Sequence, residues 1–452
     1  MRLRSWLRVD ARLNRGRYFA WGVILFAVKS NIDRVLTREI FHWTWEPWSY
    51  LLPVTGVPGK WSALEVYGWL LLISLPFIAV GVFLTLRRLR DAGLPLVLVS
   101  LIFLPYVKLL LFLFLSVAPS REERVVSPRW PVHRNPWLPK SAFGNALFGI
   151  LVTMLFAVAL VAFGTKVLGS YGWGLFVGLP FLQGLATVVF ASRLEPLKKG
   201  QAIGLANLSI LVTGGVLIAI AIEGLICLAM AIPLAVPLAS LGGYVGYLIQ
   251  RRRPPLRPIY AGGLCLLMPL LMGGERVAAP DPPVYAVTTR VDVAASPAAV
   301  WKQVVEFSEI PPPTELLFRA GIAYPMRARI DGRGPGAIRY CEFSTGPFVE
   351  PIRTWDEPRL LAFDVTENPA PMEEWTPYRR IEPPHLRKFL VSRRGQFRLT
   401  ALPGGGTRLE GTTWYRHSLW PAGYWKLWSD FTIHRIHRRV LDHIRVEAER
   451  HS

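Results

Sequence analysis

Hydrophobic residues follow two different patterns along this chain, and the change lies between Gly274 and Val284. Before it, uncharged apolar stretches such as residues 205–222 and 225–249 are long enough to cross a ~30 Å hydrocarbon layer as helices. After it, no such stretch recurs, and short runs of alternating apolar and polar residues predict β-strands. The pattern therefore predicts a membrane module followed by a water-soluble module.

We expect the first module to be a multi-pass bundle of transmembrane helices. The predicted spans lie near residues 18–36, 62–86, 143–165, 172–191, 204–222, 225–249 and 258–274. The apolar run 94–118 is interrupted by Pro105 and is followed by a basic loop, residues 119–142. Because basic loops favour the cytoplasmic side, we expect this run to form a re-entrant hairpin rather than to cross.

Charge predicts the side of the membrane on which the soluble module lies. The basic start of the chain lacks the cleavage site of a signal peptide and is expected to be cytoplasmic. The arginine cluster in residues 251–257 is expected to be cytoplasmic too. If residues 258–274 then cross the membrane, the soluble module is extracytoplasmic, which is the interpretation we favour. If they only dip into the membrane, the module stays in the cytoplasm.

Three ionisable residues fall within or beside the predicted spans. Lys29 and Asp33 stand four residues apart, on one helix face, where they can neutralise each other. Such a pair either stabilises helix packing or serves transport. Glu223 lies at the junction of two spans and is a candidate functional carboxylate, unless a short hydrated turn at Gly224 removes the cost of burying it.

Composition narrows the classes of function. The formal net charge is +21, but the basic residues form short clusters beside the apolar spans, so we expect no nucleic-acid partner. Cys227, Cys265 and Cys341 occur singly and offer no disulfide framework or zinc-ligand spacing. No nucleophile elbow, phosphate-binding glycine loop or zinc motif occurs. We therefore expect no cofactor, no metal and no catalytic residue of a known motif, and protein partners stay unknown.

Two short segments connect the start of the chain to a known family. These are the arginine-aspartate-glycine segment of residues 87–93 and the segment of residues 14–18. Around them, residues 10–125 resemble the domain of unknown function 805 family of small bacterial inner-membrane proteins. The resemblance implies an inner-membrane location and brings no known activity. Asp91 is expected to pair with Arg87 or Arg88 as a structural cap.

The soluble module shows a clear order of elements. A strand is expected at residues 284–293, then a helix that opens at Ser296-Pro297 and a short helix at residues 314–320. Six more strands are expected at residues 324–331, 336–344, 347–355, 359–366, 389–401 and 407–416. A long amphipathic helix that begins at Pro421 closes the chain.

This order resembles the helix-grip fold of the SRPBCC superfamily, which includes START-type lipid-transfer domains, pollen allergens and polyketide cyclases. The matching residues are Val300-Trp301 after Ser296-Pro297, Glu350-Pro351-Ile352 followed by Trp355, and residues 411–415. The resemblance implies a curved antiparallel sheet wrapped on the long C-terminal helix, with an apolar cavity between them. The expected fold class is a multi-pass α-helical membrane module followed by an α+β helix-grip domain. The expected divisions are residues 1–125 for the family-like membrane domain, 126–275 for further transmembrane helices, 276–284 for a linker and 285–452 for the helix-grip domain.

Candidate ligand-binding residues come from the faces of the predicted strands and of the last helix. The apolar candidates are Leu361, Phe363, Phe397, Leu399, Tyr415 and Phe431. The charged candidates are Arg339, Glu342 and Glu350, which either orient a ligand headgroup or form a solvent-facing salt bridge across strands. His434, His437 and His443 are expected to be solvated, whereas His385, in the loop 368–388, is a candidate to close the cavity mouth.

These features predict a membrane-anchored module that binds a hydrophobic small molecule or a lipid for transfer or sensing. Its expected partners are the bilayer and that ligand. The alternative is an enzyme of the cyclase or hydrolase kind, which a raised pKa of Glu350 in a closed cavity would favour. A transporter component is a further alternative, and only Lys29, Asp33, Lys108 and Glu223 are available to line its polar path.

Overall fold

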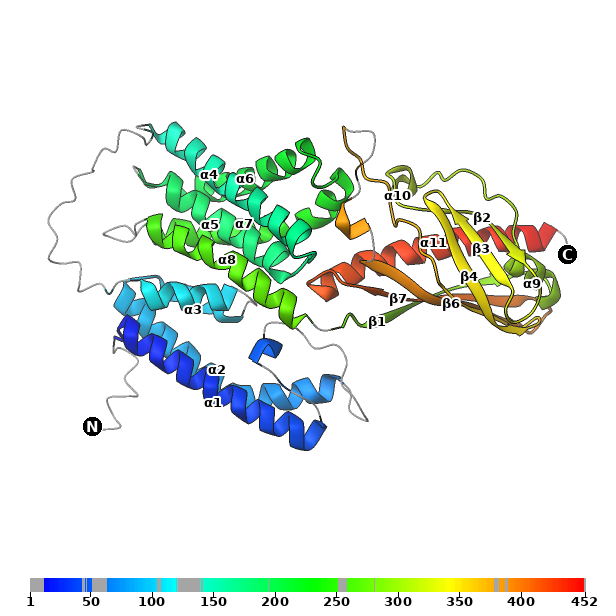
Figure 1. Cartoon of the computed structure of the whole chain (residues 1–452), viewed down its shortest axis with the longest axis horizontal. Helices are drawn as coiled ribbons and strands as arrows, with labels where there is room; N and C mark the ends of the chain where they lie inside the picture. Colours follow the sequence, from blue (N-terminus) through cyan, green and yellow to red (C-terminus); the bar gives the residue numbers. More distant parts are fainter. Residues whose placement is uncertain are drawn as a thin grey trace. The chain divides into compact units, whose positions relative to one another are not determined.

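The structure is a computed structural model, and it describes most of the chain (Figure 1). The described residues are 12–42, 45, 47–50, 63–103, 107–118, 120, 139, 141–193, 195–250, 258–279, 281–377, 381, 383–386 and 389–450. Contacts divide the chain into two compact units. Unit 1 comprises Met1–Leu217 and Ala231–Asp281, and unit 2 comprises Ile218–Met230 and Pro282–Ser452. The domain divisions expected from the sequence stay predictions.

Among the described residues of the first 281, the regular structure is helical, apart from a single bridge residue at Tyr171. The α-helices are α1 (Arg15–Phe41), α2 (Ala63–Ala92), α3 (Val107–Val117), α4 (Ala142–Ala162), α5 (Leu179–Ala191), α6 (Lys199–Ala219), α7 (Leu225–Gln250) and α8 (Pro258–Ala278). Shorter helical segments are η2 (Pro47–Tyr50), η3 (Leu96–Phe103), η5 (Phe163–Val167) and η6 (Gly174–Gly178). Each predicted span therefore coincides with helical structure.

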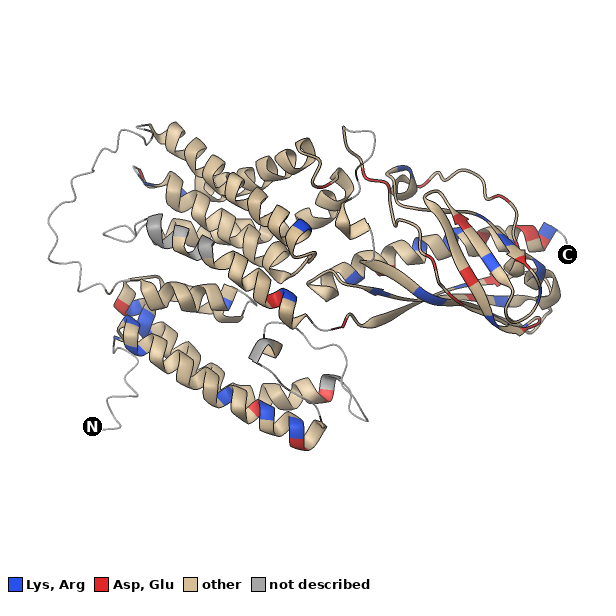
Figure 2. Ribbon diagram, viewed as in Figure 1, with Lys and Arg blue, Asp and Glu red and all other residues tan. Residues whose placement is uncertain are grey.

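Five helical segments among the described residues are long and apolar enough to cross a membrane. They are Glu65–Ala92, Ala142–Val167, Gly174–Ala191, Lys199–Ala219 and Leu225–Gln250. Figure 2 shows few charged residues on these segments and many along unit 2. This composition fits a membrane protein. The predicted spans 18–36 and 258–274 form α1 and α8, which are not among the five segments.

The two described parts of the apolar run, residues 94–103 and 107–118, belong to unit 1, and Pro105, the predicted bend, lies outside the described residues. Arg88, close to the end of α2, donates from Nε to the carbonyl oxygen of Leu115 at 2.8 Å and from Nη2 to that of Ala118. Arg88 also pairs with Asp91. The run starts directly after α2, and its last residues contact Arg88 near the end of α2, so both ends of the run lie beside the same end of this helix. This geometry agrees with the predicted hairpin and with the predicted capping role of the arginine-aspartate segment.

Unit 2 contains a seven-stranded antiparallel sheet. Its strands are β1 (Val284–Val293), β2 (Pro325–Asp331), β3 (Ile338–Phe343), β4 (Gly346–Asp356), β5 (Leu360–Asp364), β6 (Leu390–Ala401) and β7 (Thr407–His417). They lie in the order β1-β7-β6-β5-β4-β3-β2. The helices are α9 (Pro297–Val305), α10 (Leu316–Arg319), the short η7 (Pro384–Leu386) and α11 (Ala422–Arg450). The predicted order of one strand, two helices, six strands and a long helix is confirmed.

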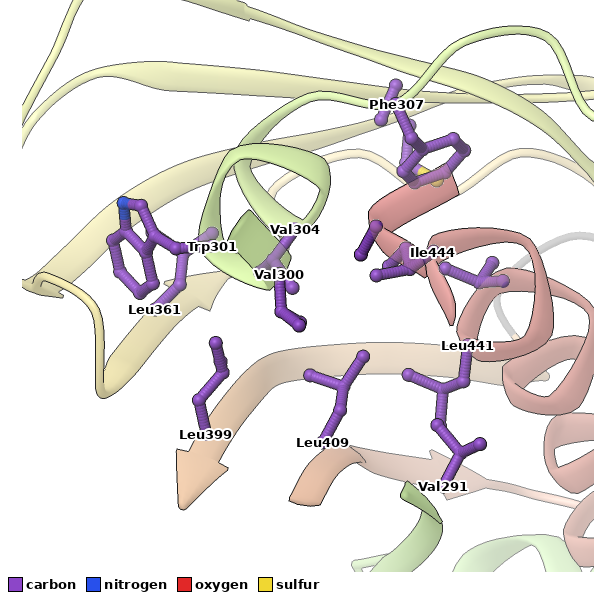
Figure 3. Close-up of a cluster of buried hydrophobic side chains, with 14 of the residues drawn as sticks. Val291, Val300, Trp301, Val304, Phe307, Leu361, Leu399, Leu409, Leu441 and Ile444 are labelled. Carbon is purple, nitrogen blue, oxygen red and sulfur yellow. The ribbon is translucent and has the colours of Figure 1, made fainter. Parts of the chain in front are cut away.

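Helix α11 packs on the concave face of this sheet. It contacts β1 at one edge and β2 at the other, so the sheet curls around the helix. Leu441 and Ile444 of α11 are fully buried with Leu361, Leu399 and Leu409 of the strands, as Figure 3 shows. A curled antiparallel sheet that encloses a C-terminal helix is the helix-grip arrangement that the sequence predicted.

Candidate ligand-binding cavity

Unit 2 encloses a cavity of about 110 Å³ between its sheet and α11. The wall combines apolar and polar side chains from several strands and the helix. Among the apolar residues are Phe363, Phe397 and Ile436, and among the polar residues are Arg339, Glu350 and His437. A concave apolar site with a few convergent polar groups is typical of small-molecule binding.

Arg339, on β3, is the most deeply buried charged group of this wall, with 1 % of its surface exposed. Its Nε donates to the carbonyl oxygen of Val305 at 3.2 Å, and its Nη1 donates to the carboxylate of Glu350 on the neighbouring strand β4. Among the described residues, Nη2 has no hydrogen-bond partner. The guanidinium carbon lies 5.5, 5.7 and 5.5 Å from the ring centroids of Phe307, Phe363 and Phe397. The cavity wall thus holds a permanent positive charge, and the Nη2 group of this charge has no hydrogen-bond partner among the described residues.

Burial shifts the protonation of the groups around Arg339. Burial raises the pKa of Glu350, and the opposing effect of the guanidinium does not cancel the rise. Burial alone would lower the pKa of Arg339, but Glu350 and Cys341 together outweigh it, so that pKa is raised as well. Cys341 lies beside the pair, and burial raises the pKa of its thiol to about 12. The cavity therefore pairs an unusually basic carboxylate with a cation that stays protonated.

His437 is a cavity residue that the sequence reasoning placed on the surface. Its Nδ1 lies 3.0 Å from the hydroxyl of Thr289 on β1, and its Nε2 lies 2.7 Å from the hydroxyl of Thr413 on β7. Burial, together with the nearby His434, lowers the pKa of His437 to about 4. The ring is therefore neutral at physiological pH. His437 shares a helix face with Ile433, one turn away, and this spacing is the signal that was missed.

Glu342 lies outside the cavity. It pairs with Arg327 at 2.6 Å and with Arg329 at 3.4 Å, both on β2. Arg327 lowers the pKa of Glu342 through its hydrogen bond. Because side chains alternate along a strand, Arg339 and Glu342 on β3 point to opposite faces. Glu342 thus forms the solvent-facing salt bridge that was one of the two alternatives, whereas Arg339 and Glu350 form a buried pair whose role in orienting a ligand headgroup stays a prediction.

The other apolar candidates divide between the cavity and its surroundings. Phe363 and Phe397 line the cavity, with ring centroids 6.1 Å apart. Leu361 and Leu399 belong to the hydrophobic core instead. Tyr415 is fully buried in a separate cluster with Val287 and Ile433, and its hydroxyl donates to Asp430 at 2.5 Å. Phe431 is 48 % exposed, so it faces away from the core.

The polar residues expected within the spans are buried and partnered. Lys29 pairs with Asp33, and the hydroxyl of Tyr50 donates to the same carboxylate. Glu223 lies in the turn between α6 and α7, where the sequence placed a turn, but it is buried and faces His385 at 3.3 Å. A hydrated carboxylate, one of the two interpretations, does not describe this geometry. His385 accordingly lies with Glu223 and does not line the cavity.

No protein-family model and no curated protein matches the chain, so the resemblance of residues 10–125 to the domain of unknown function 805 family has no support beyond its own residues. Solved structures do match. The Zhui aromatase/cyclase from a Streptomyces species is 16% identical, with 37% of this chain and 95% of that chain covered and a TM-score of 0.25.

Two further solved structures are similar to the same extent. Norcoclaurine synthase from Thalictrum flavum, in complex with dopamine and hydroxybenzaldehyde, is 14% identical over 38% of this chain and 90% of its own, with a TM-score of 0.26. A protein from Nitrosomonas europaea is 17% identical over 37% of this chain and 95% of its own, with a TM-score of 0.23. TM-scores this low show nothing about what this chain binds.

Proposed function

We propose that unit 2 binds a small hydrophobic molecule that carries a hydrogen-bond-accepting or anionic group. The observation that carries this proposal is the Nη2 group of Arg339, which is buried at the cavity without a hydrogen-bond partner among the described residues. An unsatisfied buried donor costs roughly 1–3 kcal/mol, and more when it is charged. A ligand oxygen that reaches Nη2 would remove that cost, so the cavity favours a ligand with an acceptor.

The size of the cavity selects the class of ligand. A cavity of roughly 150 Å³ is enough for one benzene molecule. The volume of about 110 Å³ is smaller than this, so the cavity takes at most one ring, with a small shift of its side chains, or a short acyl segment, and it is far too small for a whole membrane lipid. Of the two ligand classes that the sequence suggested, a hydrophobic small molecule is the one that this geometry supports.

The ring of His437 also belongs to the cavity wall. The neutral ring of His437 is held between Thr289 and Thr413, so its orientation is fixed before a ligand arrives. Phe363 and Phe397 present their rings to the same space and to the guanidinium of Arg339. A planar aromatic acid fits this wall, because its ring packs against Phe363 and Phe397 while its oxygens accept hydrogen bonds from Arg339.

Blocking the cavity tests the proposal. A Cβ atom at Gly411, on β7, would lie 3.6 Å from Leu441 and 3.7 Å from Phe397, so a side chain fits there and extends into the cavity. Small molecules extracted from the purified full-length protein are compared by mass spectrometry with those from Gly411→Val. The control is Gly423→Val, because Gly423 is exposed on α11 with open space around it. We expect one hydrophobic molecule in the wild type and the control, and none in Gly411→Val. Identical extracts from all three proteins would contradict the proposal.

One observation favours the enzyme alternative. The raised pKa of Glu350 makes this carboxylate a better proton acceptor than an exposed one, as acid–base chemistry on a bound substrate requires. In that case the bound molecule is converted over time by the wild type. Glu350→Gln then still binds the molecule and leaves it unchanged. Slow release of an unmodified molecule by both proteins would favour the binding function instead.

We further propose that the chain is an inner-membrane protein with unit 2 on the extracytoplasmic side. The five apolar segments support membrane insertion, and the arginine cluster of residues 251–257, which lies outside the described residues, supports the side. A C-terminal reporter that is active only in the cytoplasm should stay silent, and an active one would reverse the assignment. Transport gains no support, because Lys29 and Asp33 neutralise each other.

A further inference from the structure

A second cluster of polar side chains lies in unit 2, away from the cavity. Glu223 occupies the turn before α7, Cys227 lies in the first turn of α7, and His385 lies on η7. One carboxylate oxygen, the thiol sulfur and one ring nitrogen of these residues all lie within 4.8 Å of one another. All three residues are buried, with 4 %, 7 % and 6 % of their surfaces exposed. Buried carboxylate, thiol and imidazole groups that converge in this way are typical of a metal centre.

A fourth residue, Glu374, lies beside the histidine. His385 Nδ1 faces Glu223 Oε2 at 3.3 Å, whereas its Nε2 faces Glu374 Oε1 at 3.6 Å. With Nδ1 as the metal ligand, Nε2 carries the proton and points to a carboxylate. Metal-binding histidines in proteins almost always have such an outer partner, which fixes the tautomer and the ring orientation.

The surrounding structure makes the cluster rigid. The carboxylate of Glu374 also accepts hydrogen bonds from the backbone N–H groups of Ile226, at 3.0 Å, and Cys227, at 3.2 Å, so it caps α7. The backbone N–H of Leu225 donates to the carbonyl oxygen of Trp375 at 3.0 Å. These contacts fix the first turn of α7, and therefore the thiol, relative to the loop that carries the histidine.

We propose that Glu223, Cys227 and His385 form a binding site for a divalent metal ion of the zinc class, with Glu374 as the outer carboxylate that orients His385. In a tetrahedral zinc site with bonds of about 2.0–2.3 Å, neighbouring ligand atoms lie about 3.3–3.7 Å apart. The 3.3 Å between Glu223 and His385 already has this value. Three protein ligands leave the fourth position to water or to an external ligand.

Charge is compatible with a cation at this place. Glu223 and Glu374 bring two carboxylates into one buried cluster, and a divalent cation offsets both of them. With the Cys227 thiolate as a ligand the cluster keeps one net negative charge, the same as with a protonated His385 and no metal, so the geometry of the three ligand groups and not their charge carries the proposal. The competing arrangement is a metal-free cluster in which an imidazolium bridges the two glutamates, and the experiment below separates the two.

The test is the metal content of the full-length protein, purified without chelator and equilibrated with a small excess of zinc. We expect one zinc ion per chain, and less than a tenth of that in Cys227→Ser and in His385→Gln. Glu374→Gln should bind zinc about 10- to 100-fold more weakly, as expected for an outer partner. The controls are Cys341→Ser and His417→Gln, which change another buried cysteine and another buried histidine and should each retain one zinc ion.

Cobalt gives a readout that needs no variant to fold. Co²⁺ added to the wild type should produce a thiolate-to-cobalt absorption band in the near ultraviolet and the visible bands of a tetrahedral ion. Zinc should remove both. A wild-type protein that binds no zinc, or cobalt binding without a thiolate band, would overturn the proposal in favour of the metal-free cluster. Equal zinc contents in the wild type and in folded Cys227→Ser would overturn it too.

Discussion

Arg339 and Glu350 face each other directly across strands β3 and β4 and form an ion pair inside unit 2. Their side chains are 1 % and 8 % exposed, so the pair is shielded from solvent. Burying two charges is expensive, and their attraction offsets the cost only when both partners are present. A buried ion pair is therefore weak evidence that the two charges stabilise the fold, and a role in recognising a ligand explains its presence better.

Removing one partner should destabilise unit 2 more than replacing both. Arg339→Ala or Glu350→Ala leaves a buried charge unpaired, and we expect a loss of about 3–5 kcal/mol in the free energy of unfolding. The double variant Arg339→Met/Glu350→Leu fills the same space with apolar groups and should lose less than either single variant. Hydrogen exchange of the most protected β6 and β7 amides measures the stability of unit 2 within the whole chain. A double variant that is as unstable as the sum of the singles would count against this account.

Acid should weaken unit 2 through His437. The folded-state pKa of about 4 lies below the ordinary value of 6.5, so the unfolded chain takes up the proton first. The stability that the neutral ring contributes is complete above pH 6.5 and is lost as the pH falls towards 4, by roughly 3 kcal/mol for a shift of this size.

His437→Gln should remove this pH dependence, because glutamine does not titrate and still hydrogen-bonds to Thr289 and Thr413. We expect the stability of the variant, measured by hydrogen exchange at pH 7 and pH 4.5, to fall less than that of the wild type. His417 also has a pKa lowered to about 4 by burial, but it is present in both proteins. Parallel losses in the two proteins would mean that His437 does not carry the effect.

The hairpin that is closed by Arg88 predicts which side of the membrane its ends face. Leu96 and Val117, at the two ends, are both exposed, and Glu65 lies at the opposite end of α2. In a chain whose native cysteines are replaced, Leu96→Cys and Val117→Cys should react with an impermeant maleimide from the same side. Glu65→Cys should react from the other side. Opposite labelling of the first two positions would show a crossing segment.

The order of the strands and helices along the chain of unit 2 was predictable, because each element follows from local periodicity. Alternation along β5 and β6 identifies Phe363 and Phe397, and turn residues separate the strands. Helical spacing along α11 identifies only part of its buried face, because Val440 and Ile444 are buried whereas Phe431 is exposed. The same alternation, applied to β3, separates Arg339 from Glu342, although only the pairing with β4 reveals the partner of Arg339.

The parts of the sites that were missed depend on contacts between distant segments. No residue near His437 in the sequence is spaced to share a ligand with it. Its place in the cavity wall depends on hydrogen bonds to Thr289 and Thr413, which lie on two distant strands. The cluster of Glu223 and Cys227 is completed by His385, which belongs to a different part of the chain. Such a set of ligands leaves no motif in the sequence, because Glu223 and Cys227 are about 160 residues away from His385 and the three meet only in the folded unit 2.

The most direct measurement of the central claim is the binding of 4-fluorobenzoate, a ring with one anionic group, followed by ¹⁹F NMR. We expect saturable binding to the full-length wild type and to Gly423→Val, and none to Gly411→Val. Arg339→Met/Glu350→Leu should bind at least about tenfold more weakly, since a hydrogen bond to a charged group contributes roughly 1.5–3 kcal/mol. Equal binding by all four proteins, or no saturable binding by the wild type, would contradict the proposal that this cavity recognises a small hydrophobic molecule through Arg339.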